Sequence, residues 1–121
     1  MNNVQFIGYA TDKPKFKEVE GVESARFSIG ITTKVSEDKD ESLFITCRIV
    51  GKRARIACEV IDKGSRLFVC GRLSCTSWDD KQTGQKRTLY YVYLQDIQYL
   101  DDLTISRLKE VSKQKEKEWK Y

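Results

Sequence analysis

Residues 44–70 read FITCRIVGKRARIACEVIDKGSRLFVC, and three secondary-structure signals follow one another in this stretch. In its first part, Cys47 and Ile49 alternate with Phe44 and Arg48. Successive side chains of a strand point to opposite faces, so the alternation predicts a strand with one apolar face and one polar face that carries an aromatic ring. The last five residues of the stretch, Arg66–Cys70, are mostly apolar and predict a second strand.

A short helix is predicted between these two strands. Its apolar residues follow the spacing i, i+3, i+4 and i+7, which is typical of a helix that lies on a core. They are Ala54, Ala57, Cys58 and Ile61. Lys63 and Gly64 then supply a basic last turn and a glycine stop, so the helix is expected within residues 52–63.

Further short runs rich in β-branched and aromatic residues lie on both sides of this stretch. They are Val4–Tyr9, Ala25–Thr32, Arg72–Trp78 and Arg87–Leu94, in addition to Arg66–Cys70 within it. The polar segment 79–86 contains Thr83-Gly84 and predicts a long exposed hairpin. Strands, one helix and then a strand hairpin form the order of an OB-fold. We therefore expect an all-β, five-stranded Greek-key barrel with one short helix between strands 3 and 4.

The composition restricts the chemistry of the chain. The 121 residues include no histidine, which excludes a histidine general base, a histidine-activated nucleophile and a Cys/His zinc site. The four cysteines, at positions 47, 58, 70 and 75, form no CxxC pair. We expect buried free thiols without disulfides in preference to a four-thiolate zinc site. The chain is thus expected to be no enzyme and to need no metal or cofactor.

Charge is distributed unevenly along the chain. Residues 46–87 hold ten basic residues and only four acidic ones, whereas residues 36–41 hold four acidic residues, one lysine and no apolar residue. The acidic segment is expected to be a solvated loop. No apolar run approaches the roughly 18 residues that span a bilayer, and the first residues lack the features of a signal peptide. We expect a cytoplasmic protein without membrane contact.

A series of short motifs runs along residues 1–100. They are Met1-Asn2-Asn3-Val4 with Ile7-Gly8, Ala25-Arg26-Phe27-Ser28-Ile29, Gly51-Lys52, Lys63-Gly64-Ser65, Phe68-Val69-Cys70-Gly71-Arg72-Leu73, Trp78-Asp79-Asp80 and Ile97-Gln98-Tyr99-Leu100. In this order and spacing the chain resembles the bacterial-type single-stranded DNA-binding proteins. The resemblance implies an OB-fold nucleic-acid-binding domain over residues 1–100. It also implies sequence-tolerant binding of single-stranded DNA in replication, recombination or repair, and a homo-oligomer, a tetramer in preference to a dimer.

Binding of unpaired nucleic acid requires exposed rings for base stacking and cations that follow the phosphates. Trp78 and Phe44 match positions at which the family places base-stacking tryptophans, and Phe68 matches a further family aromatic. We rank them in the order Trp78, Phe44, Phe68. The candidate phosphate-binding residues are Arg48, Lys52, Arg66, Arg72, Lys81, Lys86 and Arg87.

Other aromatic positions differ from the family or stay undecided. Val35 and Val50 stand where the family commonly has stacking aromatics, which predicts weaker binding per nucleotide or a different path. Tyr90, Tyr91 and Tyr93 alternate along one predicted strand. At least one of these rings is expected to fill the barrel and another to be exposed, but the alternation does not decide which.

The tail, residues 101–121, is the part least like the family. It carries six basic and five acidic residues and not the acidic, apolar tip through which family members recruit partners. This indicates a specialised paralogue, such as one carried by a mobile element. Leu103 or Ile105 with Leu108 and Val111 would form a short amphipathic helix, and a flexible tail is the alternative. An alternative function is a protein-interaction or primosome-type accessory subunit with weak DNA binding.

Overall fold

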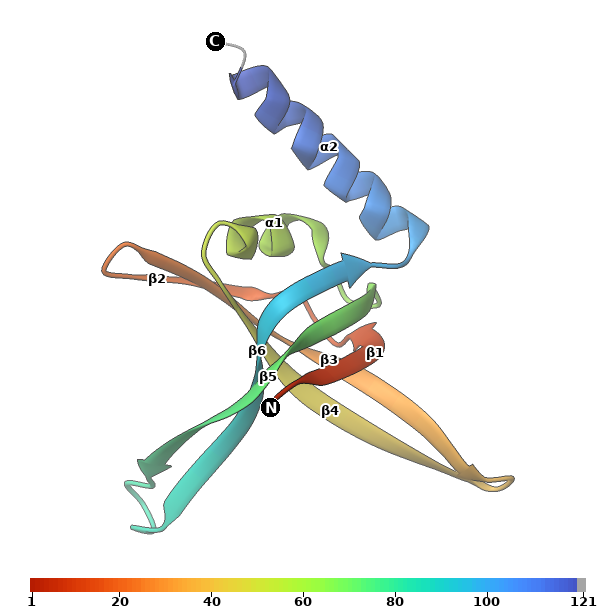
Figure 1. The fold of residues 1–121 in the computed structure, drawn as a ribbon. Helices are drawn as coiled ribbons and strands as arrows, with labels where there is room; N and C mark the ends of the chain where they lie inside the picture. Colours follow the sequence, from red (N-terminus) through yellow and green to blue (C-terminus); the bar gives the residue numbers. More distant parts are fainter. Residues whose placement is uncertain (120–121) are drawn as a thin grey trace.

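A computed structural model describes the backbone of residues 1–119 and the side chains of residues 1–114. Six strands and two helices follow one another along the chain (Figure 1). They are β1 (Val4–Ala10), β2 (Lys15–Val19), β3 (Val22–Ser36), β4 (Lys39–Val50), α1 (Arg53–Val60), β5 (Arg66–Asp79), β6 (Lys86–Tyr99) and α2 (Asp102–Trp119). None of the helices in this part of the chain is long and apolar enough to cross a membrane.

The strands form one sheet in the order β1-β5-β6-β4-β3-β2, and an additional β1–β3 pairing closes the sheet into a barrel. Closure brings two backbones very close, because a Cβ on Gly8 would lie 2.7 Å from the carbonyl oxygen of Gly30. The predicted five-stranded barrel with one helix between its third and fourth strands is confirmed. The sequence did not reveal β2, a fully exposed strand that pairs only with β3.

The runs expected as two strands at 66–70 and 72–78 form the single strand β5, which has a register shift against β6 at Cys70/Gly71. Glycine is required at this shift, since a Cβ on Gly71 would lie 2.1 Å from the carbonyl oxygen of Tyr93. The barrel core is made of alanine, β-branched, leucine, phenylalanine and cysteine side chains, which come from every barrel strand and from α1. Ala54 and Ala57 of the predicted helical stripe are buried. Ile61 is also buried but lies just past the helix end.

The cysteines are less uniformly buried than predicted. Cys47 is fully buried, and this burial raises the pKa of its thiol to about 12. Cys58 and Cys70 are half-buried, whereas Cys75 is exposed because β5 has already left the barrel at that point. The expectation of buried thiols therefore holds for Cys47 and is wrong for Cys75.

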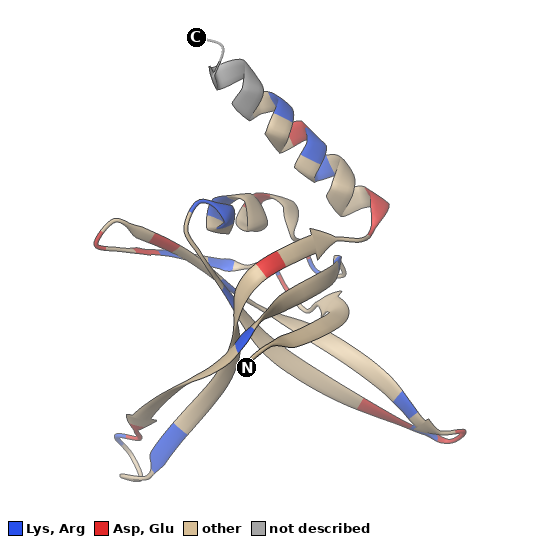
Figure 2. Ribbon diagram, in the orientation of Figure 1, with Lys and Arg blue, Asp and Glu red and all other residues tan. Residues whose placement is uncertain are grey.

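Two hairpins extend beyond the barrel as arms. The β5–β6 arm (residues 74–91) confirms the predicted hairpin, with Asp79 paired to Lys86 at its end. The β3–β4 arm (residues 31–43) contains the acidic segment at its tip, where only residues 37 and 38 lie outside the strands. The predicted solvated loop is therefore mostly strand, although its side chains are exposed. Figure 2 shows acidic residues at the end of this arm, and the two arms point in different directions in Figure 1.

The C-terminal helix α2 is held against the barrel at its N-terminal end. The Thr104 hydroxyl is buried and lies 2.8 Å from both Ser65 Oγ and Asp101 Oδ2, and the backbone N–H of Arg66 donates to Asp101 Oδ1. Further along, Arg107 Nη1 donates to the carbonyl oxygen of Val60 at 2.6 Å.

The apolar residues of α2 divide between the core and solvent. Leu108 and Val111 of the predicted stripe pack on the core, whereas Leu103 is exposed. The alternative prediction was a flexible tail over residues 101–121. The structure has a helix over Asp102–Trp119, and residues 120 and 121 lie outside the described residues.

Candidate nucleic-acid interface

A groove of about 650 Å³ lies on the outer surface of the sheet, between the β2–β3 hairpin and the β5–β6 arm. These two hairpins diverge from the barrel on the left of Figure 1. The groove is lined by Lys15, Phe16, Lys17, Ser24, Arg26, Thr46, Arg48, Thr76, Trp78, Leu89 and Tyr91. A second hollow of about 390 Å³ shares Lys15, Arg26, Thr46 and Leu89 with it, so the two form one continuous depression.

A row of four cations crosses the sheet beside this groove. Lys15 pairs with Arg26, Arg26 with Arg48, Arg48 with Tyr93, and Tyr93 with Arg72. Paired residues of neighbouring strands lie on the same face. We call Lys15, Arg26, Arg48 and Arg72 the cation row.

No acidic side chain among residues 1–114 forms an ion pair with the cation row. The ion pairs of the described residues are Arg55–Glu23 and Arg87–Asp80, and neither includes a member of the row. Like charges directly opposite each other on adjacent strands are destabilising. An anion bound along the row would relieve this repulsion, and a phosphate chain is an anion that can contact several cations at once.

The two aromatic residues ranked first are both exposed, but only Trp78 lines the groove. Trp78 is 48% exposed, and its register partner on β6 is Arg87. Phe44 is 68% exposed and its ring covers Gly30, where a Cβ would come within 3.3 Å of Phe44 Cε1. The same side of Gly30 faces Thr11, which lines the second hollow. Phe44 therefore lies close to the second hollow, although it lines neither hollow.

Phe68 is not brought to the groove. It is half-buried and pairs with Ile7 of β1 and Gln98 of β6, on the opposite side of the barrel from β2 and β3 in the sheet order. Ile7 itself is 49% exposed. Phe68 thus belongs to a different, partly apolar surface.

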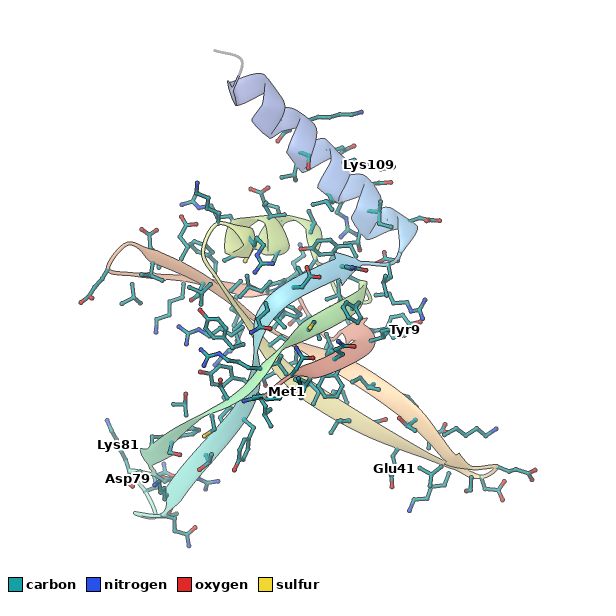
Figure 3. All side chains as sticks on the ribbon, viewed as in Figure 1. Met1, Tyr9, Glu41, Asp79, Lys81 and Lys109 are labelled. Atoms are coloured by element: carbon teal, nitrogen blue, oxygen red, sulfur yellow. The ribbon has the colours of Figure 1, made fainter. Side chains whose placement is uncertain are left out.

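The predicted cations fall into three groups. Arg48 lines the groove and Arg72 ends the cation row. Lys81, Lys86 and Arg87 lie at the far end of the β5–β6 arm, where Figure 3 labels Lys81 and Asp79. Lys52, at the start of α1, and Arg66, at the first residue of β5, line neither hollow.

Acidic residues offset part of the positive charge at the arm tip. Arg87 Nε donates to Asp80 Oδ2 at 2.8 Å, and Asp79 is the register partner of Lys86 on the neighbouring strand. Hydrogen bonds from the Gln82 backbone and from Arg87 hold the pKa of Asp80 below its ordinary value, so this carboxylate stays charged. Among the described residues, Arg87 at the arm tip is therefore paired with a carboxylate, whereas no member of the cation row is.

Several groove residues were missed by reasoning from the sequence. Lys15 and Lys17 belong to the unrecognised strand β2, and Arg26 faces outward between buried Ala25 and Phe27. The alternation of residues 25–27 was a usable signal for Arg26, since it matches that of Arg48. No local signal marks the lysines, because β2 has no apolar alternation.

The tyrosines of β6 are separated by the two faces of the strand. Tyr91 lines the groove, Tyr93 is half-buried on the same face, and Tyr90 is 64% exposed on the other face. The expectation that one of these rings fills the barrel is wrong. Val92 and Leu94 occupy the core instead, and at Tyr90 the strand still lies in the arm and has not yet entered the barrel.

The chain is similar to known proteins over most of its length. The model of the single-strand binding protein family matches residues 1–100. The chain belongs to this family. It is 34% identical over 95 residues to a single-stranded DNA-binding protein of Wolinella succinogenes. The aligned residues cover 78% of this chain and 48% of that protein. A single-stranded DNA-binding protein of Helicobacter pylori is 32% identical over 106 residues, 83% of this chain and 58% of that protein. The chain spans about half the length of these curated relatives.

Val50 stands on the groove side of the sheet. It pairs with Ser24, a residue that lines the groove. Paired residues of neighbouring strands share a face. Trp78 and Tyr91 are the aromatic residues that line the groove from the β5–β6 side.

Proposed function

We propose that the chain binds single-stranded DNA in a sequence-tolerant manner. The proposal is supported above all by the groove that combines the exposed ring of Trp78 with Arg26 and Arg48, which face each other without a counter-charge among the described residues. Bases of an unpaired strand would stack on Trp78 and Tyr91, and phosphates would contact the cation row. Membership of the single-strand binding protein family supports the same function.

The chemistry of the groove suits tolerance of sequence. Every base has a π-face, so stacking on an aromatic ring does not select one base over another. Phosphate contacts are also independent of sequence, although they make the affinity depend strongly on salt. The depression is open and is lined chiefly by cations, rings and small hydroxyl side chains.

We extend the proposal to a role in replication, recombination or repair, carried out by a homo-oligomer, a tetramer in preference to a dimer. Ile7 and Tyr9 on the outer face of β1 are 49% and 56% exposed, and Phe68 lies beside Ile7. This surface would be covered by a second copy. The mass of the protein in solution, measured with and without a long oligonucleotide, tests the oligomeric state.

The DNA-binding proposal is tested by titrating an oligonucleotide against the protein while following tryptophan fluorescence at two salt concentrations. A Trp119→Phe background assigns the signal to Trp78, because the chain has only two tryptophans. We expect quenching, an affinity that falls as salt rises, and similar affinities for unrelated sequences.

The matched variant is Trp78→Ala. Loss of one stacking partner should weaken binding by about 1 to 3 kcal/mol without unfolding the protein. An affinity equal to that of the unsubstituted protein would remove Trp78 from the site. Absence of binding at low salt would overturn the function itself and favour the alternative of a protein-interaction subunit.

A further inference from the structure

Tyr93 and Arg72 form a stacked pair at the end of the cation row. The Arg72 guanidinium carbon lies 4.6 Å from the centroid of the Tyr93 ring. The two residues are register partners on β5 and β6, and Tyr93 is also the partner of Arg48 on β4. The ring therefore stands between two arginines on the outer face of the sheet.

This position makes Tyr93 different from Tyr91. Tyr91 lies two residues earlier on the same face and lines the groove, whereas Tyr93 lines neither hollow. One face of the Tyr93 ring is already occupied by a guanidinium. A base that stacked on that face would have to displace Arg72, so Tyr93 is poorly placed as a stacking platform.

We propose that Tyr93 is a positioning residue that holds the Arg72 guanidinium in place to contact a DNA phosphate, while Tyr91 takes a base. The inference rests on the proposed binding of single-stranded DNA. It gives the two tyrosines different roles. Tyr91 stacks on a base, and Tyr93 positions the arginine that contacts the DNA backbone.

The geometry of arginine supports this division. A guanidinium that stacks on a ring uses its flat face, so the N–H donors at its edge remain free for phosphate oxygens. The Arg72 side chain is otherwise exposed, and it forms no ion pair with another described residue. Contact with the ring restricts its rotamers before the ligand arrives, which lowers the entropic cost of ordering it on binding.

The test compares four variants in the oligonucleotide titration: Tyr93→Leu, Tyr93→Phe, Arg72→Gln and the double variant Tyr93→Leu/Arg72→Gln. Arg72→Gln should reduce the slope of log affinity against log salt by about 0.7, the contribution of one phosphate contact to a single strand. Tyr93→Leu should weaken binding severalfold and shift the slope in the same direction. Tyr93→Phe retains the ring and should bind like the unsubstituted protein.

The double variant separates positioning from an independent contact. If Tyr93 acts through Arg72, the double variant should bind no more weakly than Arg72→Gln. Tyr90→Leu is the matched control, since it removes a tyrosine from the same strand on the opposite face and should change neither affinity nor slope. If Tyr93→Leu fails to fold, Arg72→Lys keeps the positive charge without the planar stack and should still lose affinity severalfold.

The inference is overturned if the losses from Tyr93→Leu and Arg72→Gln multiply, if Tyr93→Leu leaves the salt slope unchanged, or if Arg72→Lys binds normally. These outcomes differ from failure of the proposed function. In that case the unsubstituted protein would show no salt-dependent binding, and Trp78→Ala would have no effect.

Discussion

Arg26 and Arg48 stand directly opposite each other on β3 and β4, and Lys15 stands opposite Arg26 on β2. Three adjacent like charges do not stabilise a sheet. Each such pair lowers the free energy of unfolding of the free protein by up to about 1 kcal/mol. The cost is offset only when an anion is bound. These residues are therefore better explained by binding than by folding.

The four cysteines differ in their surroundings, and this difference leads to a prediction about single residues. Burial raises the pKa of Cys47 from an ordinary value of 9.0 to about 12, while Cys75 is exposed on the β5–β6 arm. The thiolate is the reactive form. At pH 8, an alkylating reagent should modify Cys75 rapidly and leave Cys47 unmodified until the protein unfolds, as followed by peptide mass spectrometry. Rapid modification of Cys47 in the folded protein would contradict the buried position of the β4 core face.

Each long strand performs two tasks along its length. β5 buries Leu67 and Val69 in the barrel and then carries Trp78 out along an exposed arm. β4 similarly buries Cys47 and Ile49 after presenting Phe44 to solvent. Because the arms continue barrel strands, the rings and cations they carry are held by the same backbone hydrogen bonds that form the core.

The junction between β6 and α2 depends on one carboxylate. Burial raises the pKa of Asp101, but hydrogen bonds from the Arg66 N–H and from Thr104 outweigh this effect, so its pKa lies below the ordinary value of 3.8. Asp101→Ala would leave these donors unsatisfied and should lower the free energy of unfolding by about 1 to 3 kcal/mol at pH 7. Chemical denaturation measures this loss.

The pH dependence of that loss has a definite sign. A depressed pKa in the folded state gives stability that is present above pH 3.8, the unfolded value, and is lost as pH falls through the folded value. The difference between the unsubstituted protein and Asp101→Ala should therefore shrink below about pH 4. Asp102→Ala, at the neighbouring exposed position, should cost only a few tenths of a kcal/mol. A difference that stays constant down to pH 2 would show that Asp101 acts only through packing.

At the level of the whole molecule, the groove exists because β6 joins β4 to β5 in one sheet. Lys15, Arg48 and Trp78 are separated by tens of residues in the chain, and they line one depression only after β6 pairs with both β4 and β5. The positive surface is therefore a property of the assembled sheet. It should lower the stability of the free protein and raise its affinity for an anionic strand.

Arg26→Gln tests this opposition. Removing one member of the cation row should raise the free energy of unfolding of the free protein by a few tenths to about 1 kcal/mol. It should also weaken oligonucleotide binding and lower the salt slope by about 0.7. Lys109→Gln on α2, which Figure 3 labels far from the arms, changes the net charge equally and should alter neither quantity. The proposed role of the row would be wrong if both variants affected binding to the same extent.

The buried and exposed faces of β4 and α1 could be read from the amino-acid sequence alone. The alternation of residues 44–50 separated the buried side of β4 from its exposed side. The stripe of α1 identified its buried alanines, and the family motifs located Trp78 at the start of an exposed hairpin turn. These features are local, because side-chain direction in a strand or helix follows from backbone periodicity alone.

Which outward-facing residues meet depends on the pairing of distant strands. The register of β2, β3 and β4 brought Lys15, Arg26 and Arg48 into one row, and the pairing of β1 with β5 placed Phe68 on another surface beside Ile7. They also divided Tyr91 from Tyr93, which lie on the same face but have different neighbours. Register depends on backbone hydrogen bonds between segments distant in the chain, and no local pattern of residues encodes such pairings.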